Sequence, residues 1–145
     1  MKKKALIISN DMFLNYEYDN GNYIIKNNKI LSKLKHKVEY DNISSKRINS
    51  LMASNYIKEF IKHYNYSYCI ISLNNYDDSI NNAVEALEEN GIKTILVATS
   101  NASKEQILKV EKLANNNLVK YVVVDDVLKE QKDNKLNSVI LKFCA

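Results

Sequence analysis

Glycine and proline are scarce in this chain of 145 residues, which has two glycines and no proline. Dinucleotide-binding and P-loop sites need several glycines, because backbone N–H groups must come close to the phosphate oxygens. Gly21 and Gly91 are the only candidates, and neither follows the first apolar run of the chain. The sequence therefore excludes a glycine-rich phosphate cradle.

Arginine is also scarce, because Arg47 is the only one in a chain whose formal net charge is +4. Much of the excess charge lies in residues 2–4 and 26–37. A nucleic-acid surface needs a dense basic stripe, and arginine supplies its bidentate contacts to phosphate and guanine. Lysines spread over solvated helix faces are the plainer interpretation of these residues. We therefore expect no nucleic-acid partner.

Long apolar runs, cysteines and histidines are few as well. Residues 5–8 are too short an apolar run for a signal peptide, and no run approaches the length of a membrane span. Cys69 and Cys144 form no CxxC motif and fit a reducing compartment without a disulfide. His36 and His63 fall on predicted helix surfaces, away from any cluster that could bind zinc or activate a serine. We expect a cytoplasmic protein without membrane contact.

Residues 68–97 predict the unit around which the chain is organised. The run YCIISL at 68–73 is rich in β-branched and aromatic residues and is typical of a strand buried on both faces. Gly91 ends the predicted helix that follows, and residues 92–97 form a second buried strand. Strand, helix and strand of this length give a right-handed crossover between parallel strands. The helix has its apolar side chains at helical spacing, at Ile80, Ala83, Val84 and Leu87.

The rest of the chain repeats this alternation. Ser103 and Gln106 form a capping-box pattern at the start of one predicted helix. Residues 136–143 have helical spacing, with a strand at 138–143 as the alternative. The other predicted strands cover 4–9, 37–43 and 119–124. The other predicted helices cover 24–34, 46–64 and 103–117. A polar, aromatic loop is predicted for residues 15–23.

Five βα units predict one flavodoxin-like domain over residues 1–145. We expect an α/β three-layer αβα sandwich with a five-stranded parallel sheet in the order 2-1-3-4-5. Ligands of such sheets bind outside the carboxyl ends of the strands, at the switch point between strands 1 and 3. Turns and helix caps also place polar residues there, and this structural role is the interpretation we favour.

Polar residues nevertheless define a candidate ligand-binding crevice at these strand ends. Asp11 with Asp125 or Asp126 could offer carboxylate oxygens to Mg²⁺, and we expect no other cofactor. The candidate residues are Ser9, Asn10, Asp11, Ser44, Ser72, Asn74, Asp77, Thr99, Ser100 and Asp125.

Four segments resemble the response-regulator receiver family. KKKALIISNDMFL is similar to its first strand, IISLNNYDDS to its third strand and loop, ILVATS to its fourth strand and YVVVDDVL to its fifth. The resemblance implies a flavodoxin-like regulatory domain. It also implies a partner-binding face over residues 103–117, 119–124 and the C-terminal segment.

The same resemblance implies that the usual phosphorylation chemistry is absent. Ser72 stands where the family has its phosphorylated aspartate, and Val124 stands roughly where it has a lysine. Thr99 or Ser100 matches the hydroxyl residue that acts as the switch in that family. Ser9, Asn10 and Asp11 fall near the family's pair of acidic residues.

A second resemblance is to the SGNH hydrolases. SND at 9–11, DNISS at 41–45, LNNYD at 73–77 and KLN at 135–137 follow the order of that family's sequence blocks. The resemblance puts Asp11 at the nucleophile, Ser45 at the oxyanion glycine, Tyr76 at the asparagine and Lys135 at the histidine. It implies a degenerate hydrolase, in which Ser9, Ser44 or Ser45 would have to be the nucleophile.

Three functional hypotheses follow from the sequence. The first is a non-catalytic regulatory or protein-interaction domain, receiver-like in fold, that binds a protein partner or itself. The second is a small-ligand or Mg²⁺-binding enzyme centred on Asp11, Ser72 and Asp125. The third is a degenerate SGNH-type hydrolase.

Overall fold

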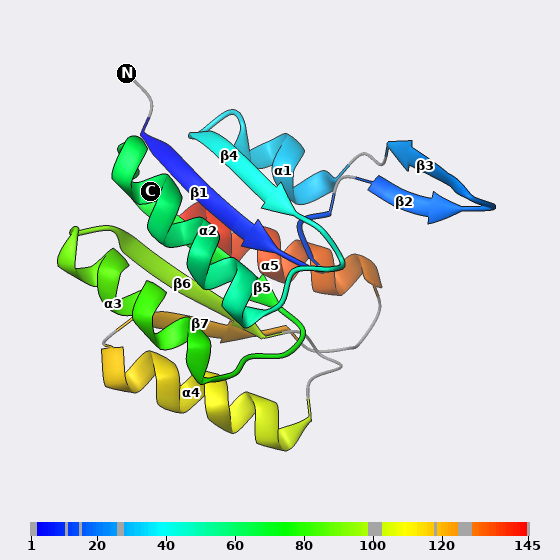
Figure 1. Ribbon diagram of the computed structural model, residues 1–145. Helices are drawn as coiled ribbons and strands as arrows, with labels where there is room; N and C mark the ends of the chain where they lie inside the picture. The colour runs from blue at the N-terminus through cyan, green and yellow to red at the C-terminus, as the bar shows by residue number, and fades with distance from the viewer. Residues whose placement is uncertain are drawn as a thin grey trace.

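The sheet lies at the centre of the protein, whose computed structural model describes residues 3–10, 12–14, 16–25, 28–98, 103–117, 119–124 and 129–144. Its five parallel strands have the order β4-β1-β5-β6-β7 (Figure 1). When only these five strands are numbered along the chain, their order in the sheet is 2-1-3-4-5. The predicted flavodoxin-like arrangement is therefore confirmed. The strands are β1 (Lys4–Ser9), β4 (Glu39–Ser44), β5 (Tyr68–Leu73), β6 (Lys93–Ala98) and β7 (Lys120–Val123).

Helices cover both faces of the sheet and create two apolar cores (Figure 1). Residues 5–9 of β1 and all of β5 are buried, as expected for strands that are covered on both sides. One face carries α2 (Ser50–His63), α3 (Asn81–Glu89) and α4 (Lys104–Asn117). The other face carries α1 (Lys29–Leu34) and α5 (Lys129–Phe143). This is the expected three-layer sandwich. The C-terminal segment forms the helix α5, so the alternative of a sixth strand at 138–143 is wrong.

The segment before α1 differs from the prediction. Residues 16–25 form an antiparallel hairpin of β2 (Tyr16–Asp19) and β3 (Asn22–Ile25), where a loop and the start of a helix were expected. Asn20 and Gly21 both have positive φ, 48° and 83°, as the type I′ turn of an Asn-Gly hairpin requires. The two strands pair mainly with each other and project away from the main sheet (Figure 1).

Asparagine side chains decide where α1 and α2 begin. The Asn28 carboxamide oxygen accepts hydrogen bonds from the N–H groups of Ile30 and Leu31, so α1 starts at Lys29 and not at residue 24. Asn49 caps α2 in the same way, by accepting from the Met52 N–H at 2.9 Å. The predicted helix start at residue 46 is therefore wrong, because a cap residue has extended backbone geometry.

The two cysteines lie in different cores. Cys69 is buried among the side chains beneath α2 and α3, and Cys144 is buried on the α1 and α5 side. Both are free thiols. Burial raises the pKa of both, that of Cys144 to about 11 although Lys93 and Lys37 act in the opposite direction.

A cluster of polar and aromatic side chains closes the amino end of β1. The Lys4 ammonium lies 3.1 Å from the Asp41 carboxylate and over the rings of Tyr64 and Tyr66. The Tyr66 hydroxyl donates to Asp41 at 2.6 Å. Burial by itself raises the pKa of Asp41, but the Tyr66 hydrogen bond and Lys4 outweigh it, so the pKa is lowered overall. This cluster joins β1 and β4 to the segment after α2.

The lowered pKa of Asp41 predicts an acid-dependent loss of stability. A carboxylate with a lowered folded-state pKa stabilises the fold above its unfolded pKa of about 3.9, and this contribution disappears as the pH falls through the folded value. We expect Asp41→Asn to be less stable than the native chain at pH 7, with the difference shrinking below about pH 4. Urea unfolding at several pH values measures this, with Glu39→Gln on the same strand as the control. A difference that does not change with pH would contradict the assignment.

A left-handed glycine ends α3 and directs the chain into β6. Gly91 has φ +68°, and its N–H donates to the carbonyl of Glu88 at 3.0 Å. The N–H of Ile92 donates to the carbonyl of Leu87 at 2.9 Å, and both side chains are buried in one core. These two bonds and this apolar contact define a Schellman motif, and the prediction that Gly91 ends the helix is confirmed.

Replacement of Gly91 should therefore destabilise the fold through backbone strain alone. A Cβ at this position would meet no atom within 4 Å, so no steric clash contributes. We expect Gly91→Ala to lower the free energy of unfolding by about 1 kcal/mol. Gly91→Asn should cost less, because asparagine tolerates left-handed geometry better. Urea unfolding measures both, and equal stability of the alanine variant and the native chain would contradict the prediction.

Candidate functional site

Three serines lie in one row at the carboxyl ends of neighbouring strands. Ser44 of β4 pairs in register with Ser9 of β1, and Ser9 pairs with Ser72 of β5. Ser9 and Ser72 are buried, and Ser44 is partly buried. The Ser9 hydroxyl accepts from the N–H of Phe13 at 3.2 Å, and the Ser44 hydroxyl donates to the side chain of Asn42. The structure thus brings together three of the residues that the sequence proposed for a crevice.

Asn10 connects the switch point to its surroundings through both ends of its carboxamide. Its Nδ2 donates to the carbonyl of Ile48 at 2.9 Å and to Oδ1 of Asn74 at 3.0 Å. Its Oδ1 accepts from the backbone N–H of Asn74 at 2.9 Å, and its own N–H donates to the carbonyl of Ser72 at 3.0 Å. Only 8% of Asn10 is exposed. The side chain therefore fastens the end of β1 to the end of β5 and to the turn before α2.

Tyr76 fills the space under the loop that follows β5. Its hydroxyl lies 2.9 Å and 2.8 Å from the carbonyl oxygens of Ile71 and Val97 and accepts from the N–H of Leu73. Burial raises the pKa of the Tyr76 phenol, which stays protonated and can donate. The Tyr76 N–H donates to the side chain of Gln106 at 2.7 Å. Gln106 therefore holds this loop instead of completing the predicted capping box, although its N–H does donate to Ser103.

Ser50 and Asp77 stabilise the next turn. The Ser50 hydroxyl donates to the carbonyl of Asn75 at 3.3 Å and accepts from the N–H of Asp77 at 3.0 Å. The Asp77 carboxylate accepts from the hydroxyl and the N–H of Ser79, and these bonds lower its pKa. Asp77, a candidate ligand-binding residue in the sequence analysis, is thus the cap of the short helix η1 (Asp78–Ile80).

Ser72 is the one residue of the row with an unsatisfied polar atom. Its Oγ is buried and has no hydrogen-bond partner in the part of the chain that the structure describes. The receiver resemblance puts the phosphorylated aspartate at this position. A side chain that is 0% exposed cannot meet a phosphoryl donor unless the strand end opens.

Four of the candidate residues, Asp11, Thr99, Ser100 and Asp125, lie outside the described residues, so the Mg²⁺ hypothesis stays a prediction. Within the described ranges, no three His, Cys, Asp or Glu side chains are grouped as a metal site would need. His36 is exposed, and the exposed His63 ring lies 3.0 Å from Glu59 on the same helix. None of the helices that the structure describes has the length and apolar character of a membrane span.

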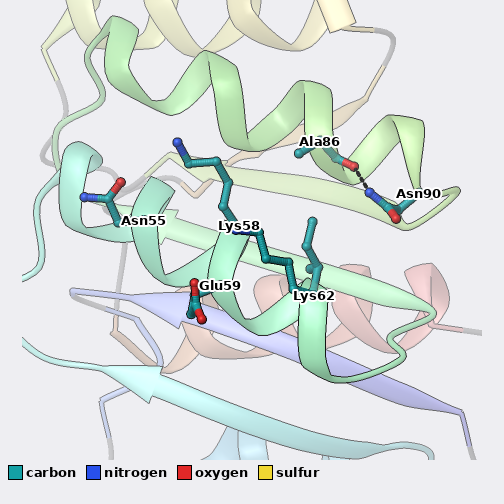
Figure 2. A pocket seen from close by; sticks show the side chains of 7 residues that line it. Asn55, Lys58, Glu59, Lys62, Ala86 and Asn90 are labelled. Atoms are coloured by element: carbon teal, nitrogen blue, oxygen red, sulfur yellow. Dashed lines mark hydrogen bonds between the residues drawn. The ribbon is translucent and has the colours of Figure 1, made fainter.

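A groove between α2 and α3 is a feature that sequence reasoning missed (Figure 2). Its volume is about 560 Å³. Lys58 and Lys62 come from α2. Asn90 directly follows α3, and its side chain donates to the carbonyl of Ala86 at 2.7 Å. The only sequence signal is the spacing of the two lysines, one helical turn apart, which is equally typical of a solvated face. The lining residues are Asn55, Lys58, Glu59, Ile61, Lys62, Ala86 and Asn90.

Comparison with known proteins adds little to this geometry. No protein-family model matches the sequence. No curated protein sequence is significantly similar to it. Among solved structures, a Burkholderia pseudomallei protein provisionally named as pilus assembly-related superposes with a TM-score of 0.48 and 14% identity, over 99% of this chain and 92% of that one. The five-stranded parallel sheet is compatible with a receiver-like fold.

The different surroundings of two buried serines predict opposite effects of the same substitution. Ser72→Ala removes a hydroxyl without a described partner, so we expect unchanged stability or a gain of up to about 1 kcal/mol. Ser50→Ala leaves the Asp77 N–H and the Asn75 carbonyl without their partner and should cost about 1–3 kcal/mol. Urea unfolding of the matched pair tests this. A larger loss for Ser72→Ala than for Ser50→Ala would show that the Ser72 hydroxyl has a stabilising partner.

Proposed function

We propose that this chain is a non-catalytic protein-interaction domain with a receiver-like fold. The Asn10 network carries the proposal, because it uses the polar groups of the switch point to hold the protein together. A ligand that entered between the ends of β1 and β5 would have to displace the bonds from Asn10 to Ile48 and Asn74. Such buried amide bonds are costly to leave unmade.

Two positions of the receiver resemblance support a role in binding rather than in phosphoryl transfer. Ser72 is a fully buried hydroxyl where that family has an acceptor carboxylate. Val124 is a fully buried apolar side chain where it has a cation, and its N–H donates to the carbonyl of Ala98. Phosphoryl transfer depends on positioned charges around the transferred group. At the two described positions this chain has a buried hydroxyl and a side chain of the apolar core instead.

Exposed apolar side chains offer surface for a partner. Leu108 of α4 is 64% exposed, and Tyr121 of the edge strand β7 is 38% exposed. Both belong to the face that the receiver resemblance implies for partner binding. Single exposed apolar residues are common on proteins, so they support the proposal without defining the contact.

Thermal melting with and without Mg²⁺ and beryllofluoride, a phosphoryl mimic, tests the proposal. A ligand at a hundred times its Kd would stabilise the fold by about 2.7 kcal/mol, or roughly 3 °C for each kcal/mol in a chain of this size. We expect no shift of the melting temperature. A shift that Asp11→Ala abolishes would overturn the proposal, since it would demonstrate a working phosphate or metal site at the strand ends. Asn115→Ala on the exposed side of α4 is the control for unspecific effects of substitution.

A further inference from the structure

The α2 wall of the α2–α3 groove carries positive charge that no described carboxylate compensates. Lys58 and Lys62 lie one turn apart on α2, and both line the groove (Figure 2). Neither lysine forms an ion pair within the ranges that the structure describes. Glu59, the acidic residue of the described lining, lies 3.0 Å from His63. A carboxylate brought into the groove would therefore meet two ammonium groups without a partner.

The outward side of α3 carries the opposite charge. Ala83, Val84 and Leu87 are buried against the sheet, so Glu85 and Glu89 lie on the other side of the helix, one turn apart. Both glutamates are exposed, and neither forms an ion pair with another described residue. The two carboxylates thus have the same i, i+4 spacing as the two lysines of α2.

The lysines and the glutamates also lie at about the same height along their helices. Both α2 and α3 lead from one strand of the parallel sheet to the next, so the two helices run in the same direction (Figure 1). The Ser50 hydroxyl accepts from the N–H of Asp77 at 3.0 Å, and this bond aligns the starts of the two helical segments at an offset of 27 residues. The same offset separates each lysine from one of the two glutamates.

We propose that two copies of this chain form a dimer through their α2–α3 faces, about a two-fold axis parallel to these helices. Such an axis leaves every residue at its own height and places α3 of each copy over the groove of the other. Lys58 then meets Glu85 of the second copy. Lys62 meets Glu89 of the second copy, and by symmetry each pair forms twice. The inference rests on the proposed interaction function and assigns its partner as a second copy of this chain.

The same arrangement covers the apolar lining of the groove. Ile61 and Ala86 are only partly buried in the single copy. A helix seated over them removes apolar surface from water, which favours association. Because α3 forms one wall of the groove and also carries the carboxylates, the face is complementary to itself. Such an isologous contact closes as a dimer.

Sedimentation velocity over a range of protein concentrations tests the contact. We expect a dimer that weakens as the ionic strength rises from about 0.05 to about 0.5 M. The groove variant Lys58→Glu/Lys62→Glu should dimerise at least about tenfold more weakly. The helix variant Glu85→Lys/Glu89→Lys should show the same loss, because either change makes every pair like-charged. The chain with all four substitutions should dimerise like the native protein, because it exchanges the charges of the two helices without a change of net charge.

The control is Lys29→Glu/Lys33→Glu, which makes the same change of charge at the same spacing on the exposed side of α1, on the other face of the sheet. This variant should dimerise like the native protein, and far-UV circular dichroism checks that each variant is folded.

Native protein that stays monomeric at every concentration would overturn this inference. So would a folded chain with all four substitutions that stays monomeric, or a dimer that both charge reversals retain. Each of these results leaves the proposed function standing, since that is overturned only by a ligand-induced shift in melting.

Discussion

The carboxamide of Asn10 is the interaction on which the carboxyl end of the sheet depends. Polar groups that are buried where strands end are costly to leave without a hydrogen-bond partner. Asn10 supplies partners for Ile48 and Asn74 with one side chain. Ser50 and Tyr76 do the same for the loop that follows β5. A few buried hydrogen bonds therefore join the ends of β1 and β5 to the turns beside them.

This arrangement changes how the polar strand ends are interpreted. In related architectures the switch point is the place for a ligand, and here the described side chains of Ser9 and Asn10 make hydrogen bonds within the protein, whereas the Ser72 hydroxyl has no described partner. The proposed interaction function therefore looks to the outer surface for the partner contact. The β2–β3 hairpin and the α2–α3 groove are described features that lie outside these hydrogen bonds.

Much of the fold follows from the sequence, because β5 and β6 are short apolar runs and Gly91 marks the turn between them. The hairpin was missed, although Asn20-Gly21 between alternating residues is a strong hairpin signal. It was hidden by the polar character of the surrounding segment. The partners of Asn10 and the missing partner of Ser72 could not be predicted, because both depend on which side chains distant segments bring to one point. The groove was missed for the same reason, since its lysines and Ala86 come from different helices.

The two buried cysteine thiols differ in how much of the fold must open before a reagent can reach them. Cys69 lies in the central strand, so a reagent reaches it only when the sheet itself comes apart. Cys144 follows the last turn of α5 and becomes accessible when that helix end frays. Both react only as thiolates, which burial suppresses in the closed state. Alkylation rates at the two positions therefore separate global unfolding from local opening without any added probe.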